Sequence, residues 1–250
     1  MTLTAIDILT KEFGKSRNSF TPTILSRELV APNVAAELSE GNAADGQPIW
    51  GVAVATMLPN GTTLRARYET DEPIRSTCFP SRAAAEAHIA AMRAHLAPPT
   101  SKSWKTKRFP VECARLKVER SFTAAEWAAM QRGSIPETME DKWFIYEKNG
   151  RLSFHRSWTG VCIFQVRFRE IAAGMEIAEA WVNRKTDQYS CADDRYDAGL
   201  VLWLIDVLLL KRPAAFPDTG LAEGPGLMKR WSDVGRAGLG EDGSMGEPQA

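Results

Sequence analysis

The chain has 250 residues, of which 44% are hydrophobic and 25% are charged, as in globular proteins large enough to bury a core. Its 31 basic and 31 acidic residues leave no net charge at pH 7, so no global field draws it to nucleic acid or to an anionic membrane. We expect neither partner. The longest apolar run, residues 198–210, is also shorter than the stretch of about 20 residues that spans a bilayer.

The four cysteines lie far apart and include no CxxC pair, which argues against a zinc site. The N-terminal stretch has acidic residues where a secretion signal needs an apolar core, so we predict a cytoplasmic protein with reduced thiols. The sequence has no phosphate-loop, dinucleotide-binding, nucleophile-elbow or zinc-protease motif, and we predict neither a cofactor nor a metal. The cysteines are Cys78, Cys113, Cys162 and Cys191.

Residues 1–97 predict a small hairpin–helix unit with an irregular lead-in. Two β-prone runs, 49–58 and 62–68, flank a Pro-Asn-Gly turn. Ser81 is expected to cap an Ala-rich helix that continues to Leu96 and stops before two prolines.

Residues 98–110 predict a linker. From Ser101 to Arg120 the chain carries seven basic residues against two acidic ones, typical either of a solvated connector leading into a strand or of a local surface that faces phosphate. Thr123 and Glu126 then have the spacing of a capping box, which predicts a short helix.

The stretch from Glu137 to Arg169 concentrates polar and aromatic residues and predicts a three-stranded antiparallel meander. Asn-Gly and Trp-Thr-Gly sequences provide its two turns. In the last strand alternate residues are large and apolar, so one face should pack on a core. The expected strands are 142–147, 151–157 and 161–169.

A fourth strand, 177–183, is expected to join this sheet, followed by a helix that begins at Asp193 or Asp194 and ends at Leu210. The helix is apolar nearly all round. It therefore either covers the sheet or buries residues 200–210 against a protein partner.

These elements predict an α+β fold, with an antiparallel meander sheet covered by a hydrophobic C-terminal helix and a smaller N-terminal hairpin–helix unit. We place the sheet–helix domain at residues 111–212. The tail at 213–250 holds eight of the 18 glycines and predicts disorder.

The candidate catalytic residues are His155, Glu140 and Asp141. In a meander the first strand begins near the end of the second, so these groups should meet. A histidine beside a carboxylate is the minimum for general acid–base catalysis. The same residues would also make an ordinary ion pair.

The candidate ligand-binding residues are Arg156, Trp158 and Arg184. A guanidinium can hold a phosphate through two hydrogen bonds, and an indole offers a stacking surface. The structural alternatives are a strand-end arginine paired with a carboxylate, a tryptophan that covers the sheet edge and a polar loop after a strand.

The acids at the start of the last helix, Asp193, Asp194 and Asp197, have a spacing that suits a metal such as magnesium, but acids in a first helical turn also favour capping. We expect capping. Cys162 is expected to be buried and is not a candidate nucleophile.

The words MEDKWFIY, FHRSWTG and CIFQVRF resemble an uncharacterised bacterial module found in proteins labelled ADP-ribosylglycohydrolases or ADP-ribosyl-dinitrogen-reductase hydrolases. The resemblance covers residues 136–211 and implies a connection with ADP-ribose or NAD chemistry. A second stretch, VAAELSEGNAADGQPIWGVAV with CFPSRAAAEAHI, resembles another small bacterial domain of unknown role.

Three functions are therefore open. The first is a binding module for an ADP-ribosyl or nucleotide-like ligand, in which Arg156 and Arg184 contact phosphates and Trp158 stacks. The second is a hydrolase of an ADP-ribosyl bond that uses His155. The third is a protein-interaction or immunity-type partner.

Overall fold

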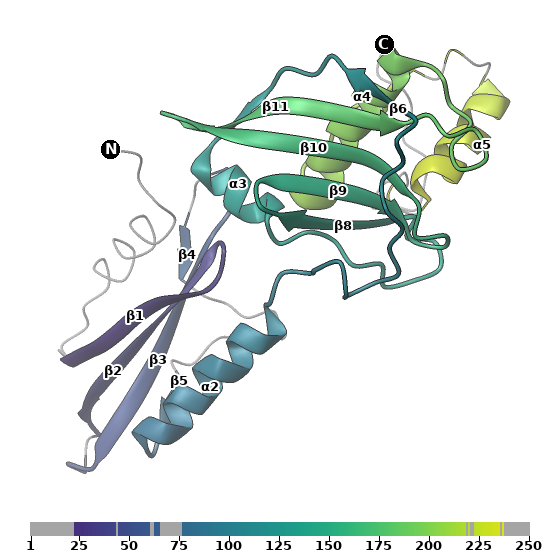
Figure 1. Cartoon of the computed structure of the whole chain (residues 1–250). Helices are drawn as coiled ribbons and strands as arrows, with labels where there is room; N and C mark the ends of the chain where they lie inside the picture. Colours follow the sequence, from purple (N-terminus) through teal and green to yellow (C-terminus); the bar gives the residue numbers. More distant parts are fainter. Residues whose placement is uncertain are drawn as a thin grey trace. The chain divides into compact units, whose positions relative to one another are not determined.

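The computed structural model describes residues 23–43, 45–60, 63–65, 77–218, 220, 223–235 and 237. The fold is α+β with two antiparallel sheets, as predicted. The chain divides into two compact units (Figure 1). The first unit comprises Met1–Ala97, Phe122–Ala129 and Ala172–Gly174, and the second comprises Pro98–Ser121, Met130–Ile171 and Met175–Ala250.

The first unit is an antiparallel sheet packed on helix α2 (Arg82–His95). Ser81 caps this helix, as predicted, because its side chain accepts a hydrogen bond from the Ala84 N–H at 3.2 Å. Ile89 and Met92 are buried against the sheet. The strands run in the order β1-β2-β3-β4, with β5 also paired to β3, and are β1 (Thr23–Ala31), β2 (Val34–Asn42), β3 (Pro48–Met57), β4 (Thr63–Arg65) and β5 (Thr77–Phe79).

Strand β2 is absent from the prediction although it lies between two other strands. Its sequence, VAAELSEGN, is rich in Ala, Glu and Gly, which have low β propensity. It is nevertheless a strand because β1 and β3 pair with it on both sides, so tertiary pairing overrides local preference. The predicted return strand 62–68 is observed at β4, and its remaining residues lie outside the described part of the chain.

The second unit contains the meander, which is confirmed. Asn149 and Gly150 both have positive φ, as a tight Asn-Gly hairpin turn requires. Gly174 and Asn183 bound a neighbouring strand that is longer than predicted. The sheet order is β6-β11-β10-β9-β8, with β7 also paired to β11, and the strands are β6 (Cys113–Leu116), β7 (Ser121–Phe122), β8 (Trp143–Lys148), β9 (Arg151–Arg156), β10 (Cys162–Ile171) and β11 (Gly174–Asn183).

Helix α4 (Asp194–Leu204) packs beside this sheet and continues as a π-helical turn, η1 (Ile205–Leu209) (Figure 1). Leu200 and Leu204 have no exposed surface, so much of the apolar surface considered for a protein partner is already buried within the chain. Asp206 is tolerated in the apolar run because it accepts two hydrogen bonds from Arg120, both at 2.8 Å.

Helix α3 (Ala124–Met130) begins with the predicted capping box: the Glu126 N–H donates to Thr123 Oγ1, and the Thr123 N–H donates to Glu126 Oε2. Ala125 and Ala128 pack with Ala residues and Met57 of the first sheet. The helix therefore groups with the first unit, whereas the sequence placed it in the 111–212 domain.

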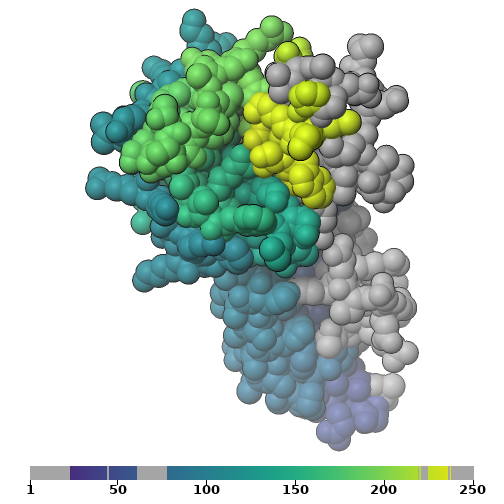
Figure 2. Space-filling model, turned by 90° about the vertical axis from the view of Figure 1, so that its right-hand side faces the viewer, coloured from purple at the N-terminus to yellow at the C-terminus, as the bar shows by residue number. Residues whose placement is uncertain are grey.

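The expected disorder after residue 212 does not hold for residues 223–234, which form helix α5 (Glu223–Val234). The end of this helix is buried: Val234 has no exposed surface, and the Asp233 carbonyl accepts a hydrogen bond from the Trp143 indole at 2.7 Å. Figure 2 shows α5, in yellow, against the green and teal atoms of the second unit. The glycine-rich composition of this segment predicts disorder, whereas the contacts that stabilise α5 come from residues about 80 to 90 positions earlier in the chain.

Candidate functional site

Arg156 is held by α5, not by the acids before β8 that the sequence suggested as partners. Its Nη2 donates to Asp233 Oδ1 at 2.9 Å and its Nη1 donates to the Asp233 carbonyl at 2.7 Å. The guanidinium also lies 4.6 Å from the centre of the Trp143 ring. With its donors used in this way, Arg156 is a structural link between β9 and α5 and is not presented to a phosphate.

His155 lies in the core of the second unit, 3% exposed, and does not approach the predicted carboxylates. Its Nδ1 is 2.9 Å from the Gly160 carbonyl, which can only accept, so this nitrogen carries the proton. The ring stacks on Tyr146 at 5.6 Å between centroids. Burial lowers the pKa of His155, and the bond to Gly160 opposes this only in part.

Glu140 and Asp141 therefore form no acid–base pair with His155. Asp141 Oδ2 instead accepts hydrogen bonds from the N–H groups of Glu137 and Thr138, at 2.9 and 3.0 Å. Glu140 is an exposed residue. The proposed His–carboxylate arrangement is absent from this geometry because β9 directs His155 inward and the acids lie on a surface turn.

Arg184 is also neutralised within the fold. Its Nη1 donates to Asp197 Oδ2 at 2.6 Å, and its Nη2 donates to Asp194. The Tyr189 hydroxyl donates to the other Asp197 oxygen at 2.5 Å. Asp193 caps α4, accepting hydrogen bonds from two backbone N–H groups, so the expected capping role is confirmed for this residue. Asp194 and Asp197 instead accept hydrogen bonds from Arg184.

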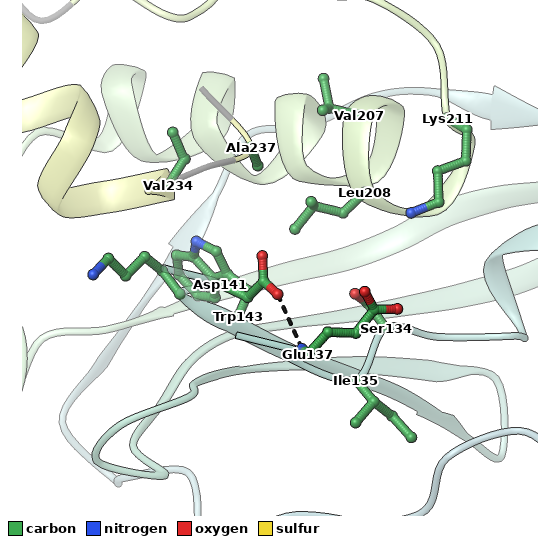
Figure 3. A pocket seen from close by; sticks show the side chains of 11 residues that line it. Ser134, Ile135, Glu137, Asp141, Trp143, Val207, Leu208, Lys211, Val234 and Ala237 are labelled. Carbon is green, nitrogen blue, oxygen red and sulfur yellow. Dashed lines mark hydrogen bonds between the residues drawn. The ribbon is translucent and has the colours of Figure 1, made fainter. Parts of the chain in front are cut away.

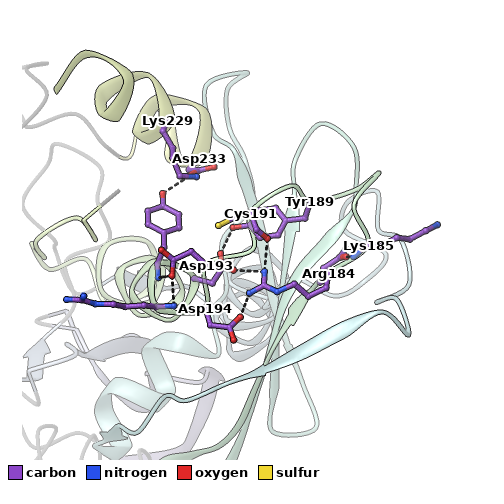
Figure 4. Close-up of polar contacts among 12 residues, drawn as sticks. Arg184, Lys185, Tyr189, Cys191, Asp193, Asp194, Lys229 and Asp233 are labelled. Atoms are coloured by element: carbon purple, nitrogen blue, oxygen red, sulfur yellow. Dashed lines mark hydrogen bonds and ion pairs between the residues drawn. The ribbon is translucent and has the colours of Figure 1, made fainter. Parts of the chain in front are cut away.

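Figure 4 shows this polar cluster at the start of α4, with Asp233 and Lys229 on one side. Desolvation and the neighbouring Asp197 carboxylate raise the pKa of Tyr189. The Tyr196 hydroxyl donates to Asp233 at 2.6 Å, so the cluster fastens α4 to α5. Each charged group of the cluster has a hydrogen-bond or ion-pair partner within the fold, which favours a structural role over a binding one.

The three predicted ligand contacts do not form one site. Arg156 is bound to α5 and Arg184 to α4, while Trp158 is 57% exposed on the turn after β9. None of them lines the pocket that the second unit does contain.

That pocket has a volume of about 270 Å³ and lies between the segment preceding β8, the end of η1 and the end of α5 (Figure 3). Its walls combine apolar side chains with charged groups of both signs. Asp141 is the one predicted site residue that lines it. The lining consists of Ser134, Ile135, Glu137, Asp141, Lys142, Trp143, Val207, Leu208, Lys211, Val234 and Ala237.

Lys211 is the distinctive residue of this pocket. Figure 3 shows its side chain reaching from the helix end toward the cavity. Lys211 is exposed as a whole residue, but partial desolvation still lowers the pKa of its ammonium group, an effect that Arg132 reinforces and that Glu137 and Asp141 oppose. Within the described residues no hydrogen bond or ion pair holds this ammonium.

The backbone that presents Lys211 is unusual in two ways. It follows the π-helical turn η1, a form that is rare and frequent at functional sites. Lys211 itself has a φ of 52°, which costs a non-glycine residue on the order of 1 kcal/mol. Lys211 is not among the residues predicted from the sequence, in which its local signal is a lysine directly after a long apolar run.

Among the described residues, the cysteines and acids provide no second chemical centre. The described residues contain no group of three His, Cys, Asp or Glu side chains that could hold a metal. Burial raises the pKa of Cys162 to about 12, so it is a protonated core residue, as expected. No helix in the described part of the chain has the length and hydropathy to cross a membrane.

Comparison with known proteins identifies no relative: no protein-family model matches the sequence, and neither a curated protein nor a solved structure is significantly similar to it.

Proposed function

We propose that the second unit is a binding module for a small anionic, nucleotide-like ligand, and that the ligand occupies the pocket at Lys211. The observation that carries this proposal is a lysine ammonium without a described hydrogen-bond partner at the edge of a cavity of about 270 Å³. Ligand sites usually combine an apolar concave surface with a few polar groups that fix orientation.

The pocket lining carries two lysines and two carboxylates, a combination that suits a ligand with both an anionic group and hydroxyl groups. Partial desolvation disfavours the charged form of the Lys211 ammonium, and a phosphate beside it would favour that form again. The carboxylates of Glu137 and Asp141, which line the same pocket, can accept hydrogen bonds from hydroxyls. A ribose phosphate offers both groups, as carboxylates that bind ribose hydroxyls in dinucleotide sites illustrate.

The size of the pocket suits one end of such a ligand, because complete sites for drug-sized molecules measure about 300–1,000 Å³. The MEDKWFIY segment, which resembles a module of ADP-ribosyl-processing proteins, contributes Asp141, Lys142 and Trp143 to the lining. ADP-ribose is therefore the first ligand to test. In this proposal Lys211 takes the phosphate-binding role that the sequence assigned to Arg156 and Arg184.

Isothermal titration calorimetry with ADP-ribose, AMP and pyrophosphate tests the proposal. We expect the wild-type protein to bind at least one of them and Lys211→Met to bind it at least tenfold more weakly, equivalent to about 1.4 kcal/mol. Lys117→Met removes an exposed lysine outside the pocket and should bind like the wild type. The absence of heat with all three ligands, or equal affinity for Lys211→Met, would overturn the proposal.

A further inference from the structure

A segment of the second unit, residues 98–111, carries a run of exposed cations. Lys102, Lys105, Lys107 and Arg108 are all exposed, and none forms an ion pair with an acid in the described chain. The sequence contains no acidic residue between positions 98 and 111. We refer to these four side chains as the basic strip.

The backbone of the basic strip is fixed, although the sequence predicted a linker there. The Lys107 N–H donates to the Gly160 carbonyl at 2.7 Å, and the Trp104 indole donates to the Ser157 carbonyl at 2.8 Å. Gly160 has a φ of +73°, and a Cβ at this position would lie 2.9 Å from the Lys105 carbonyl oxygen. The strip is therefore held against the turn that follows β9.

That turn presents an aromatic ring to solvent. Trp158 is 57% exposed, and its indole N–H donates to the Met139 carbonyl at 2.8 Å. Lys142 Nζ lies 4.4 Å from the ring centre. These two contacts hold the indole in place while most of it stays accessible.

We propose that the basic strip and Trp158 form a surface that binds single-stranded nucleic acid. Such surfaces need two parts: cations that follow the phosphate backbone, and an aromatic ring on which unpaired bases stack. The neutral net charge of the chain does not argue against this, because the strip is a local concentration of charge.

Other polyanions fit the surface less well. A double helix is read by a helix or a two-stranded ribbon placed in a groove, and the strip is neither. A membrane surface would need several apolar side chains to insert among the cations, but the uncharged residues between Lys102 and Arg108 are Ser103, Trp104 and Thr106, and the Trp104 indole is bonded to the fold. The exposed Val111 and Met139 lie outside the strip, so vesicle binding is kept as an outcome of the test.

None of the four strip residues lines the Lys211 pocket, and neither does Trp158, although Lys142 both lines the pocket and contacts the Trp158 ring. The proposal rests on the strip and Trp158 and does not depend on the proposed ligand.

Fluorescence anisotropy with labelled 12-nucleotide oligo(U) and oligo(dT) at several salt concentrations tests the proposal. We expect Lys105→Ala/Lys107→Ala to weaken binding and to reduce the slope of log affinity against log salt by about 1.4, since each of the two phosphate contacts on a single strand contributes about 0.7. Trp158→Ala should lower affinity roughly tenfold at every salt concentration. Both alanine substitutions keep the backbone contacts of the strip.

The matched control, Lys117→Ala/Lys148→Ala, removes two exposed lysines elsewhere in the same unit and should bind like the wild type. Thermal melts establish that each variant is folded. The proposal is overturned if neither oligonucleotide binds at low salt, if the control weakens binding as much as the strip variant, or if the protein binds phosphatidylserine vesicles and not oligonucleotides.

Discussion

Arg156 illustrates how the partners of one residue can differ from those that the sequence suggested. The sequence suggested a guanidinium that waits for a phosphate, whereas the structure gives it the carboxylate and the carbonyl of Asp233. Its side chain is 19% exposed and that of Asp233 is 7% exposed. Because the pair is largely removed from water, it cannot be broken without leaving a poorly solvated charge.

Replacing Arg156 by Ala should therefore destabilise the second unit by about 2 kcal/mol or more, because Asp233 would keep only the Tyr196 hydroxyl and Lys229 as side-chain partners. Urea unfolding measures the effect. Arg167→Ala is the control: its pair with Glu179 is 51% and 34% exposed, and such pairs contribute about 1 kcal/mol or less. Equal losses in the two variants would contradict the structural role of Arg156.

His155 makes stability depend on pH. Burial holds its folded-state pKa below the value of about 6.5 for a free histidine, so the unfolded chain binds the proton more readily. The contribution of His155 to the free energy of unfolding should be fully present above pH 6.5. It should be lost as the pH drops from there toward the pKa of the folded state.

We expect the wild type to lose roughly 1 kcal/mol more stability than His155→Phe between pH 7.5 and 5.5. Urea unfolding of both proteins at both pH values measures this difference. The difference between the two proteins isolates the contribution of His155 from that of the other titrating groups. If the wild type loses no more stability than His155→Phe over this range, the pKa of His155 is not lowered in the folded protein.

At the scale of elements, the basic strip and the turn after β9 depend on Gly160. A side chain at this position has to adopt a positive φ and also meets the Lys105 carbonyl. Gly220 separates these effects, because it has a φ of +65° and no atom within 4 Å of the position a Cβ would take.

Gly220→Ala should cost about 1 kcal/mol of strain, and Gly160→Ala should cost at least about 1 kcal/mol more. Thermal unfolding of the two variants measures the difference. If both lose the same stability, the strip is not packed against the turn.

Elements were predictable where local and tertiary preferences agree. The Asn149–Gly150 turn and the capping box at Thr123 specify their own backbone, and both are confirmed. Strand β2 and helix α5 were missed because their residues favour neither form locally, and partners far along the chain provide the stabilising contacts.

At the scale of the whole molecule, the fold class followed from the sequence but the candidate site did not. The pocket joins residues near 134–143, 207–211 and 234–237, three segments that no periodicity connects. Asp141 was identified because it stands in a dense polar segment. Lys211 acquires its role only when the η1 turn and α5 are placed beside β8, information that a single sequence does not contain.

The most direct test of the central claim is an NMR titration of the Lys211 ammonium, with and without ADP-ribose. Lys211→Met identifies the signal. We predict a pKa below the ordinary 10.5 in the free protein, because the pocket desolvates the charge, and a rise when the anion binds beside it. A pKa that is unchanged at ligand concentrations that saturate binding would contradict the account, because the ligand would then bind elsewhere.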